Sequence, residues 1–166
     1  NYNNGDYISP PKKGLKAFSR NYTSTLFDKE GYEEGLHLNL FDKFEDTESY
    51  LDYMDAFFGS IDANDLLGML NTWQMGDIGK HQKFNNNTKE ALANINCPAL
   101  VMPSSTDLSF PARNNIPEVN EMPEAELVVI NTKHGHLAGG MSTALTSQED
   151  VTFIDKNIKE FLKKIA

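Results

Sequence analysis

The chain has 166 residues, of which 39% are apolar, 23% charged and 10% aromatic, a composition typical of a globular protein that can bury a core. Its 15 Lys and Arg stand against 24 Asp and Glu, for a net charge of −9. Positive charge is nowhere clustered, which argues against nonspecific binding to nucleic acid or anionic membranes. The sequence has no run of about 18 apolar residues that could span a membrane.

Cysteine content and the start of the chain bear on its compartment. The single cysteine, Cys97, excludes an internal disulfide framework and a thiolate metal cluster, and we expect a buried thiol. The chain begins without an initiator Met or a basic-then-apolar leader, so we expect that sequence precedes Asn1. Sequons at Asn21 and Asn86 would be glycosylated only on a secretory route. The compartment stays open, with the cytoplasm favoured.

Helical patterns dominate the first half, after a turn-rich connector over residues 1–20. Apolar residues at three- and four-residue spacing predict a helix over 50–58, with its N-cap between Thr47 and Ser49 and its end at Gly59. A second helix is predicted from Ile61 to Trp73. Gly68 lies inside it at a cost of about 1 kcal/mol in helix propensity, which suggests close packing against another element. After a polar loop over 76–88, one or two helical turns are expected over 89–95.

The pattern changes after Cys97. The apolar runs Ala99–Met102 and Glu126–Ile130 predict strands buried on both faces, as in a parallel sheet. Between them, residues 114–122 are a weaker helical candidate, interrupted by Pro117. An apolar stripe ending at Ile165 predicts a C-terminal helix. Two capping-box patterns precede it, Thr146 with Glu149 and Ser147 with Asp150.

Strand, helix, strand and helix in this order form a βαβα unit, so the predicted fold class is α/β with a parallel sheet. Two strands are too few for a stable parallel sheet, which is normally wider and covered on both faces. We therefore expect an upstream segment or a companion chain to supply the remaining strands.

Functional groups of open parallel sheets lie on loops beyond the carboxyl ends of the strands. Two loops qualify, residues 103–111 and 131–140. An aspartate on the first, Asp107, and a histidine on the second, His136, could hydrogen-bond as the orienting carboxylate and general base of a nucleophilic triad.

Other interpretations of these loops stay open. Asp107 could instead cap the helix that follows Pro111, and His136 could be a structural histidine. His134 and His136 could together bind a metal ion, but the sequence lacks a Cys or acidic partner at ligand spacing, so we predict no metal site.

Three segments carry a family resemblance: T-W-Q-M-G-D-I at 72–78, S-T-D-L-S-F-P at 105–111 and H-G-H-L-A-G-G at 134–140. Together they resemble the C-terminal half of an α/β-hydrolase of the homoserine O-acetyltransferase type. The resemblance implies a connector and helical lid over residues 1–90 and the C-terminal part of the hydrolase core over 91–166. It makes Asp107 the triad acid and His136 the triad base, and it suggests substrate-binding roles for Trp73 and Asp77.

The same resemblance implies where the nucleophile lies. In this fold the order is Ser, Asp, His, with the serine on a G-x-S-x-G turn, and that pattern does not occur in the 166 residues. We therefore expect the serine before Asn1 or on a companion chain, and we expect this chain alone to be inactive. Ser104 and Ser105 are disfavoured as nucleophiles because their loop is the place of the acid.

The predicted function is part of a serine-dependent acyltransferase or esterase with a small-molecule acyl donor and acceptor. No metal or redox cofactor is implied, and acyl-CoA would be a co-substrate only in a transfer reaction. Leu137 and the pair Gly139-Gly140 replace the D-A-F-L that follows G-H in many homoserine acetyltransferases. The sequence therefore does not identify the acyl acceptor, and it does not decide between acyl transfer and hydrolysis. The sequence is also compatible with a homo-oligomer of this chain. The alternative is a non-catalytic, hydrolase-like structural or binding subunit of a larger assembly.

Overall fold

The computed structural model describes residues 5–42, 44–140 and 146–166, so the start of the chain at Asn1 lies outside it. The chain divides into two compact units, one of residues 1–24 and 44–76 and one of residues 25–43 and 77–166. We call them the helical unit and the sheet unit. The expected division near residue 90 refers to the lid and core of a complete hydrolase and stays a prediction. Within the described ranges, no helix is long and apolar enough to cross a membrane.

The described part of the helical unit contains α1 (Lys12–Thr23), α3 (Thr47–Gly59) and α4 (Ala63–Met75). Aromatic rings join α1 to α3, because Phe18 and Tyr22 meet the ring of Phe58 edge to face at 5.2 and 5.5 Å between centroids. Tyr50 on α3 is fully buried. The two helices predicted between residues 47 and 75 are therefore present. The connector predicted over residues 1–20 is wrong in part, because α1 begins at Lys12.

The ends of these helices differ in detail from the prediction. The N-cap of α3 is Asp46, one residue before the predicted range, and it forms a reciprocal capping box with Ser49. An aspartate is a strong N-cap because its carboxylate accepts an otherwise unpaired N–H group. The close packing against another element expected at Gly68 is wrong, since no atom of another described element lies within 4 Å of the position where its Cβ would stand.

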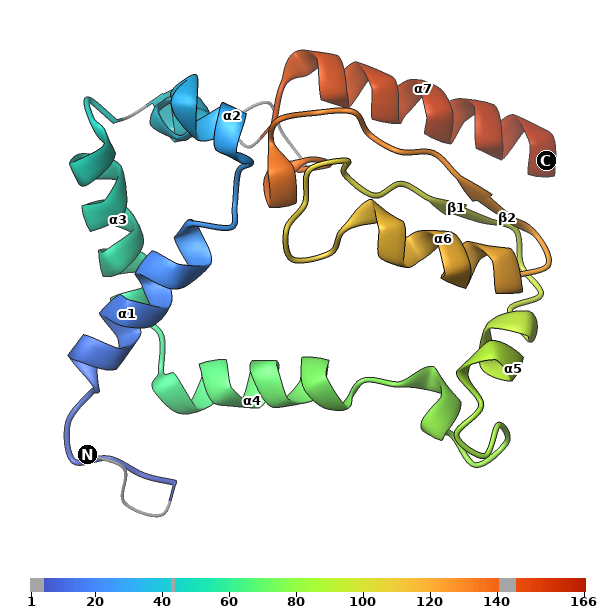
Figure 1. The fold of residues 1–166 in the computed structure, drawn as a ribbon, viewed down its shortest axis with the longest axis horizontal. Helices are drawn as coiled ribbons and strands as arrows, with labels where there is room; N and C mark the ends of the chain where they lie inside the picture. Colours follow the sequence, from blue (N-terminus) through green and yellow to red (C-terminus); the bar gives the residue numbers. More distant parts are fainter. Residues whose placement is uncertain (1–4, 43, 141–145) are drawn as a thin grey trace. The chain divides into compact units, whose positions relative to one another are not determined.

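The sheet unit is built around two parallel strands with helices beside them (Figure 1). Ala99 lies opposite Ala125, and the pairing continues to a bridge between Ser104 and Ile130. Figure 1 shows α6 (Ala112–Glu121) and α7 (Gln148–Ile165) along opposite sides of the strands. The order of the elements along the chain confirms the predicted βαβα unit. The elements of this unit are α2 (Lys29–Glu33), a 3-10 helix (Leu36–Asp42), a 3-10 turn (Ile78–Lys80), α5 (Thr88–Ala93), β1 (Ala99–Val101), α6 (Ala112–Glu121), β2 (Ala125–Leu127), a 3-10 turn (Gly135–Leu137) and α7 (Gln148–Ile165).

Three expectations for the sheet unit need correction. The strands are half-buried rather than buried on both faces, because the sheet in the described residues has only two strands. Helix α6 continues through Pro117, which removes one backbone donor without ending the helix. The thiol of Cys97 is exposed, since it lies in the turn that leads into β1.

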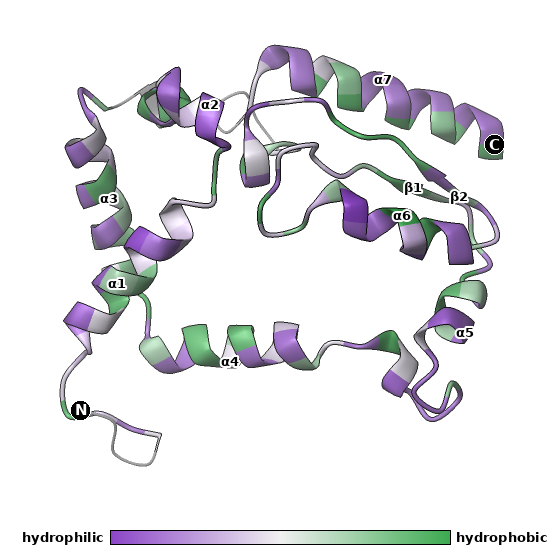
Figure 2. Ribbon diagram, viewed as in Figure 1, coloured by the Kyte–Doolittle hydropathy of each residue, from purple (hydrophilic) through white to green (hydrophobic). Residues whose placement is uncertain are grey.

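Apolar surface remains uncovered on the C-terminal helix. Figure 2 shows hydrophobic residues alternating with polar ones along α7, as the predicted amphipathic stripe requires. Four of them, Phe153, Ile158, Leu162 and Ile165, are between 38% and 53% exposed. The periodicity of this helix is thus confirmed, while part of its apolar face stays in contact with solvent in this structure.

Candidate active site

Asp107 and His136 come together at the carboxyl-terminal edge of the two strands. The Oδ2 atom of Asp107 lies 3.0 Å from Nδ1 of His136. Oδ1 of the same carboxylate accepts hydrogen bonds from the backbone N–H groups of Ser109 at 2.7 Å and Phe110 at 2.9 Å. The carboxylate is therefore held by its own loop through one oxygen and faces the imidazole with the other. It does not cap α6, which has Pro111 at that position.

The residue His136 is held in place through both its backbone and its ring. Its backbone N–H donates to the carbonyl oxygen of Leu26 at 2.8 Å, and its ring stacks on Phe110 with 5.6 Å between centroids. The side chains of Asp107 and His136 are only 11% and 21% exposed. A carboxylate at Nδ1 favours the tautomer with its proton on that nitrogen, so the lone pair is on Nε2, as a general base requires.

Gly135 lets the histidine loop approach the segment around Leu26. Its φ is +52°, and an added Cβ would stand 2.6 Å from the Leu26 carbonyl oxygen and 3.0 Å from Cα of Phe27. Only glycine fits a left-handed backbone at such a close approach. Sequence reasoning found the G-H motif but missed its contact at Leu26, because a backbone carbonyl leaves no side-chain signal.

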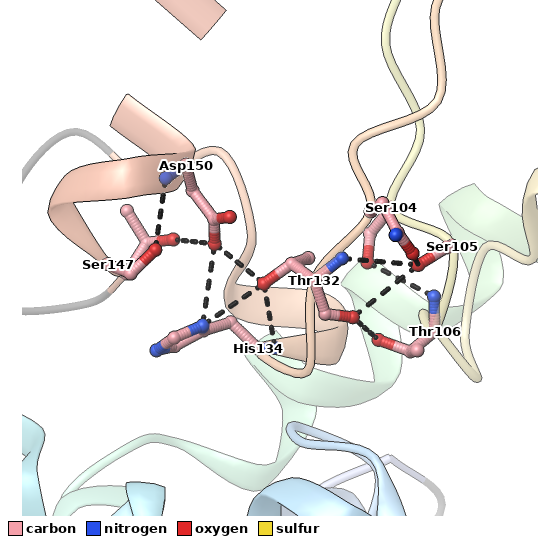
Figure 3. A network of polar contacts seen from close by, with 9 residues as sticks. Ser104, Ser105, Thr106, Thr132, His134, Ser147 and Asp150 are labelled. Atoms are coloured by element: carbon pink, nitrogen blue, oxygen red, sulfur yellow. Dashed lines mark hydrogen bonds and ion pairs between the residues drawn. The ribbon is translucent and has the colours of Figure 1, made fainter. Parts of the chain in front are cut away.

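A second polar network joins the loop of His136, residues 131–140, to α7 (Figure 3). Oδ2 of Asp150 accepts hydrogen bonds from Oγ1 of Thr132 at 2.6 Å and from Oγ1 of Thr146 at 2.9 Å, and it lies 3.4 Å from Nδ1 of His134. Ser147 caps α7 by accepting from the Asp150 N–H at 3.0 Å. Half of the predicted capping box is thus present, but the Asp150 carboxylate turns toward the loop.

Ser104 and Ser105 take part in holding the two loops together. The hydroxyl of Ser105 accepts from the Thr132 N–H at 3.3 Å, and that of buried Ser104 accepts from the Thr106 N–H at 3.3 Å. These contacts give both serines a role in loop structure. Among the residues that the structure describes, no group of three or more His, Cys, Asp or Glu side chains could hold a metal ion.

The two predicted substrate-binding residues lie elsewhere in the chain. Asp77 accepts from the N–H of Gly79 at 2.8 Å and from the hydroxyl of Thr88 at 2.9 Å, and these two donors lower the pKa of its carboxyl. It thereby joins the 3-10 turn at 78–80 to α5. Trp73 is on α4 of the helical unit and is 53% exposed. A substrate contact for either residue stays a prediction.

Several esterases and acetyltransferases are similar to this chain in sequence, although no family model matches it. A probable esterase of Corynebacterium glutamicum is 33% identical over 165 residues, which cover 98% of this chain and 45% of the relative. An ethyl acetate hydrolase of Pseudomonas veronii is 30% identical over 125 residues, or 75% of this chain and 35% of the relative. A homoserine O-acetyltransferase of Chloroherpeton thalassium is 26% identical over 140 residues, or 82% and 36%.

Solved structures give the same result. An acetylester hydrolase from Corynebacterium glutamicum superposes with a TM-score of 0.78 at 31% identity, over 92% of this chain and 42% of that one. The acetyl esterase MekB gives a TM-score of 0.77 at 26% identity over the same shares. The chain thus spans less than half the length of the relatives it matches. The chain belongs to the α/β-hydrolase superfamily, as part of a domain related to esterases and homoserine O-acetyltransferases.

Proposed function

We propose that this chain supplies the acid and the base of a serine-dependent esterase or O-acyltransferase. The observation that carries the proposal is the 3.0 Å contact between Oδ2 of Asp107 and Nδ1 of His136. In this proposal Asp107 orients the imidazole and His136 is the general base. The nucleophilic serine is supplied by a segment outside these 166 residues.

The proposed reaction has two halves. The serine oxygen bonds to the acyl carbon of the ester while Nε2 of His136 accepts the proton of the serine hydroxyl. The imidazolium that results then protonates the departing alcohol. Water or an acceptor alcohol next attacks the acyl-serine, giving its proton to His136, and the serine oxygen recovers a proton as it leaves. Asp107 remains ionised throughout and stabilises the imidazolium in both halves.

Hydrolysis of short acyl esters is the favoured form of this chemistry. Two relatives with at least 30% identity are a probable esterase and an ethyl acetate hydrolase. At Leu137 and at Gly139-Gly140 the chain also departs from the sequence that follows G-H in many homoserine acetyltransferases. A hydrolase of this kind needs no cofactor, and acyl-CoA enters only if the acceptor is an alcohol rather than water.

Covalent labelling with a fluorophosphonate tests the proposal on the full-length protein, because this reagent bonds to serines activated by a neighbouring base. We expect one labelled serine, located by peptide mass spectrometry outside residues 1–166. His136→Ala should slow labelling by at least about 100-fold, whereas the control His81→Ala, which removes an exposed histidine, should leave the rate unchanged.

Each other result has a definite meaning. Labelling of Ser104 or Ser105 would show that the nucleophile is misplaced. Absence of both labelling and ester turnover in the full-length protein would favour the non-catalytic subunit. The 166-residue chain alone should hydrolyse activated esters no faster than free imidazole does.

A further inference from the structure

Thr132 touches both loops of the candidate active site. Its backbone oxygen accepts a hydrogen bond from Oγ1 of Thr106, the residue before Asp107, at 2.8 Å. Its hydroxyl oxygen accepts from the backbone N–H of His134, two residues before His136, at 3.1 Å. Thr132 therefore helps to set the spacing between the acid loop and the histidine loop, together with the contacts of Ser105.

Asp150 fixes the position of Thr132. The residue is 5% exposed. Its carboxylate accepts a hydrogen bond from the hydroxyl of Thr132 (Figure 3) and another from the hydroxyl of Thr146. A buried carboxylate is stable only where donors surround it, so losing one of them has a large cost. Charge-assisted hydrogen bonds are also the shorter and stronger ones, as the 2.6 Å contact with Thr132 illustrates.

The protons of this network can be assigned. The single hydroxyl proton of Thr132 is donated to Asp150, since the carboxylate has none to give. The contact of 3.1 Å between the same hydroxyl oxygen and Nδ1 of His134 therefore has the imidazole as donor. Both the backbone and the ring of His134 thus donate to an oxygen that Asp150 holds in place.

We propose that Asp150, acting through Thr132, is a positioning residue for the Asp107–His136 pair. This inference rests on the proposed catalytic role of His136. If the Asp150 carboxylate is removed, Thr132 loses its anchor, and the residues adjoining both members of the pair move with it. A displacement of about 1 Å can lower turnover by about 100-fold in a site of this kind.

Steady-state kinetics of the full-length protein on p-nitrophenyl acetate tests the proposal. We expect Asp150→Asn to lower kcat by about 10- to 100-fold and to leave KM within about twofold, because substrate binding is not the step affected. Asp155→Asn is the matched control. It makes the same substitution on α7, at an exposed carboxylate paired with Lys159, and should leave kcat unchanged.

A spectroscopic readout separates positioning from stability. The proton between Nδ1 of His136 and Asp107 should give a downfield ¹H NMR signal, which Asp150→Asn should shift or broaden and Asp155→Asn should not. Thr132→Val removes the hydroxyl and should act like Asp150→Asn, whereas Thr132→Ser keeps the hydroxyl and should restore kcat. This second pair of variants keeps the test decisive if Asp150→Asn does not fold.

The results of these experiments distinguish a failure of the positioning role of Asp150 from a failure of the proposed catalytic function. Wild-type turnover in His136→Ala would overturn the proposed function itself. Loss of activity in His136→Ala, with wild-type kcat and an unchanged NMR signal in folded Asp150→Asn or Thr132→Val, would overturn the positioning role alone. A lower stability with unchanged kcat per folded molecule would likewise make Asp150 a purely structural residue.

Discussion

Replacing Gly135 with alanine should destabilise the protein and displace the candidate base. The backbone there has φ of +52°, and a Cβ would stand 2.6 Å from the Leu26 carbonyl oxygen, closer than a carbon and an oxygen can approach without a shift of the backbone. That carbonyl accepts the hydrogen bond from the His136 N–H. The substitution therefore acts on the residue next to it.

Two contributions set the size of the effect. A non-glycine residue in the left-handed region costs about 1–2 kcal/mol, and loss of the hydrogen bond to Leu26 adds about 1 kcal/mol. The free energy of unfolding should therefore fall by roughly 2–3 kcal/mol. Because the loop must move away from Leu26, ester turnover should fall as well.

Gly139→Ala is the matched control. Gly139 has φ of +80°, but the nearest atoms to its added Cβ are 3.9 and 4.0 Å away, which is ordinary contact. The free energy of unfolding of the Gly139→Ala variant should fall only by the cost of a left-handed backbone, about 1–2 kcal/mol, and its ester turnover should stay unchanged. Urea denaturation of the full-length protein and its two variants measures both losses. Equal destabilisation in the two variants, together with wild-type turnover in Gly135→Ala, would refute the reasoning.

Two further predictions concern stability. Gly68→Ala should raise the free energy of unfolding by about 0.5–1 kcal/mol, because the site on α4 is open, and an unchanged or lower urea midpoint would contradict this. Burial lowers the pKa of His37 below 6.5, so the unfolded chain binds more protons, and stability is lost as pH falls through 6.5 toward that lower value. His37→Gln should therefore lose less stability than wild type between about pH 7.5 and about pH 5.5. If urea denaturation shows that wild type and His37→Gln lose equal amounts of stability over this pH range, the expectation is contradicted.

The features of this fold that side-chain patterns encode were predictable from the sequence. Apolar runs located both strands, and the rule that loops at one sheet edge lie together placed Asp107 near His136, as the structure shows. The catalytic assignment of this pair was suggested by the positions of the two loops and by the family resemblance, and it remains a prediction.

Other features depend on contacts that leave no pattern. The carbonyl of Leu26 is a group that every residue carries, so its contact with His136 could not be predicted. Asp150 matched a capping box because an N3 carboxylate fits that pattern, yet Thr132 and Thr146 are the donors that it meets. The half-burial of the strands depends on which neighbouring strands are present, which an apolar run cannot indicate.

Turnover of p-nitrophenyl acetate by the full-length protein tests most directly whether Asp107 and His136 are the acid and base of an ester-cleaving site. His136→Ala should lower kcat/KM by about 10⁴-fold or more, and Asp107→Asn, which keeps the shape of the side chain, by about 10³- to 10⁴-fold. His81→Ala and Asp155→Asn should remain within about twofold of wild type. Turnover of His136→Ala within tenfold of wild type, in a folded protein that cleaves the ester, would contradict the assignment.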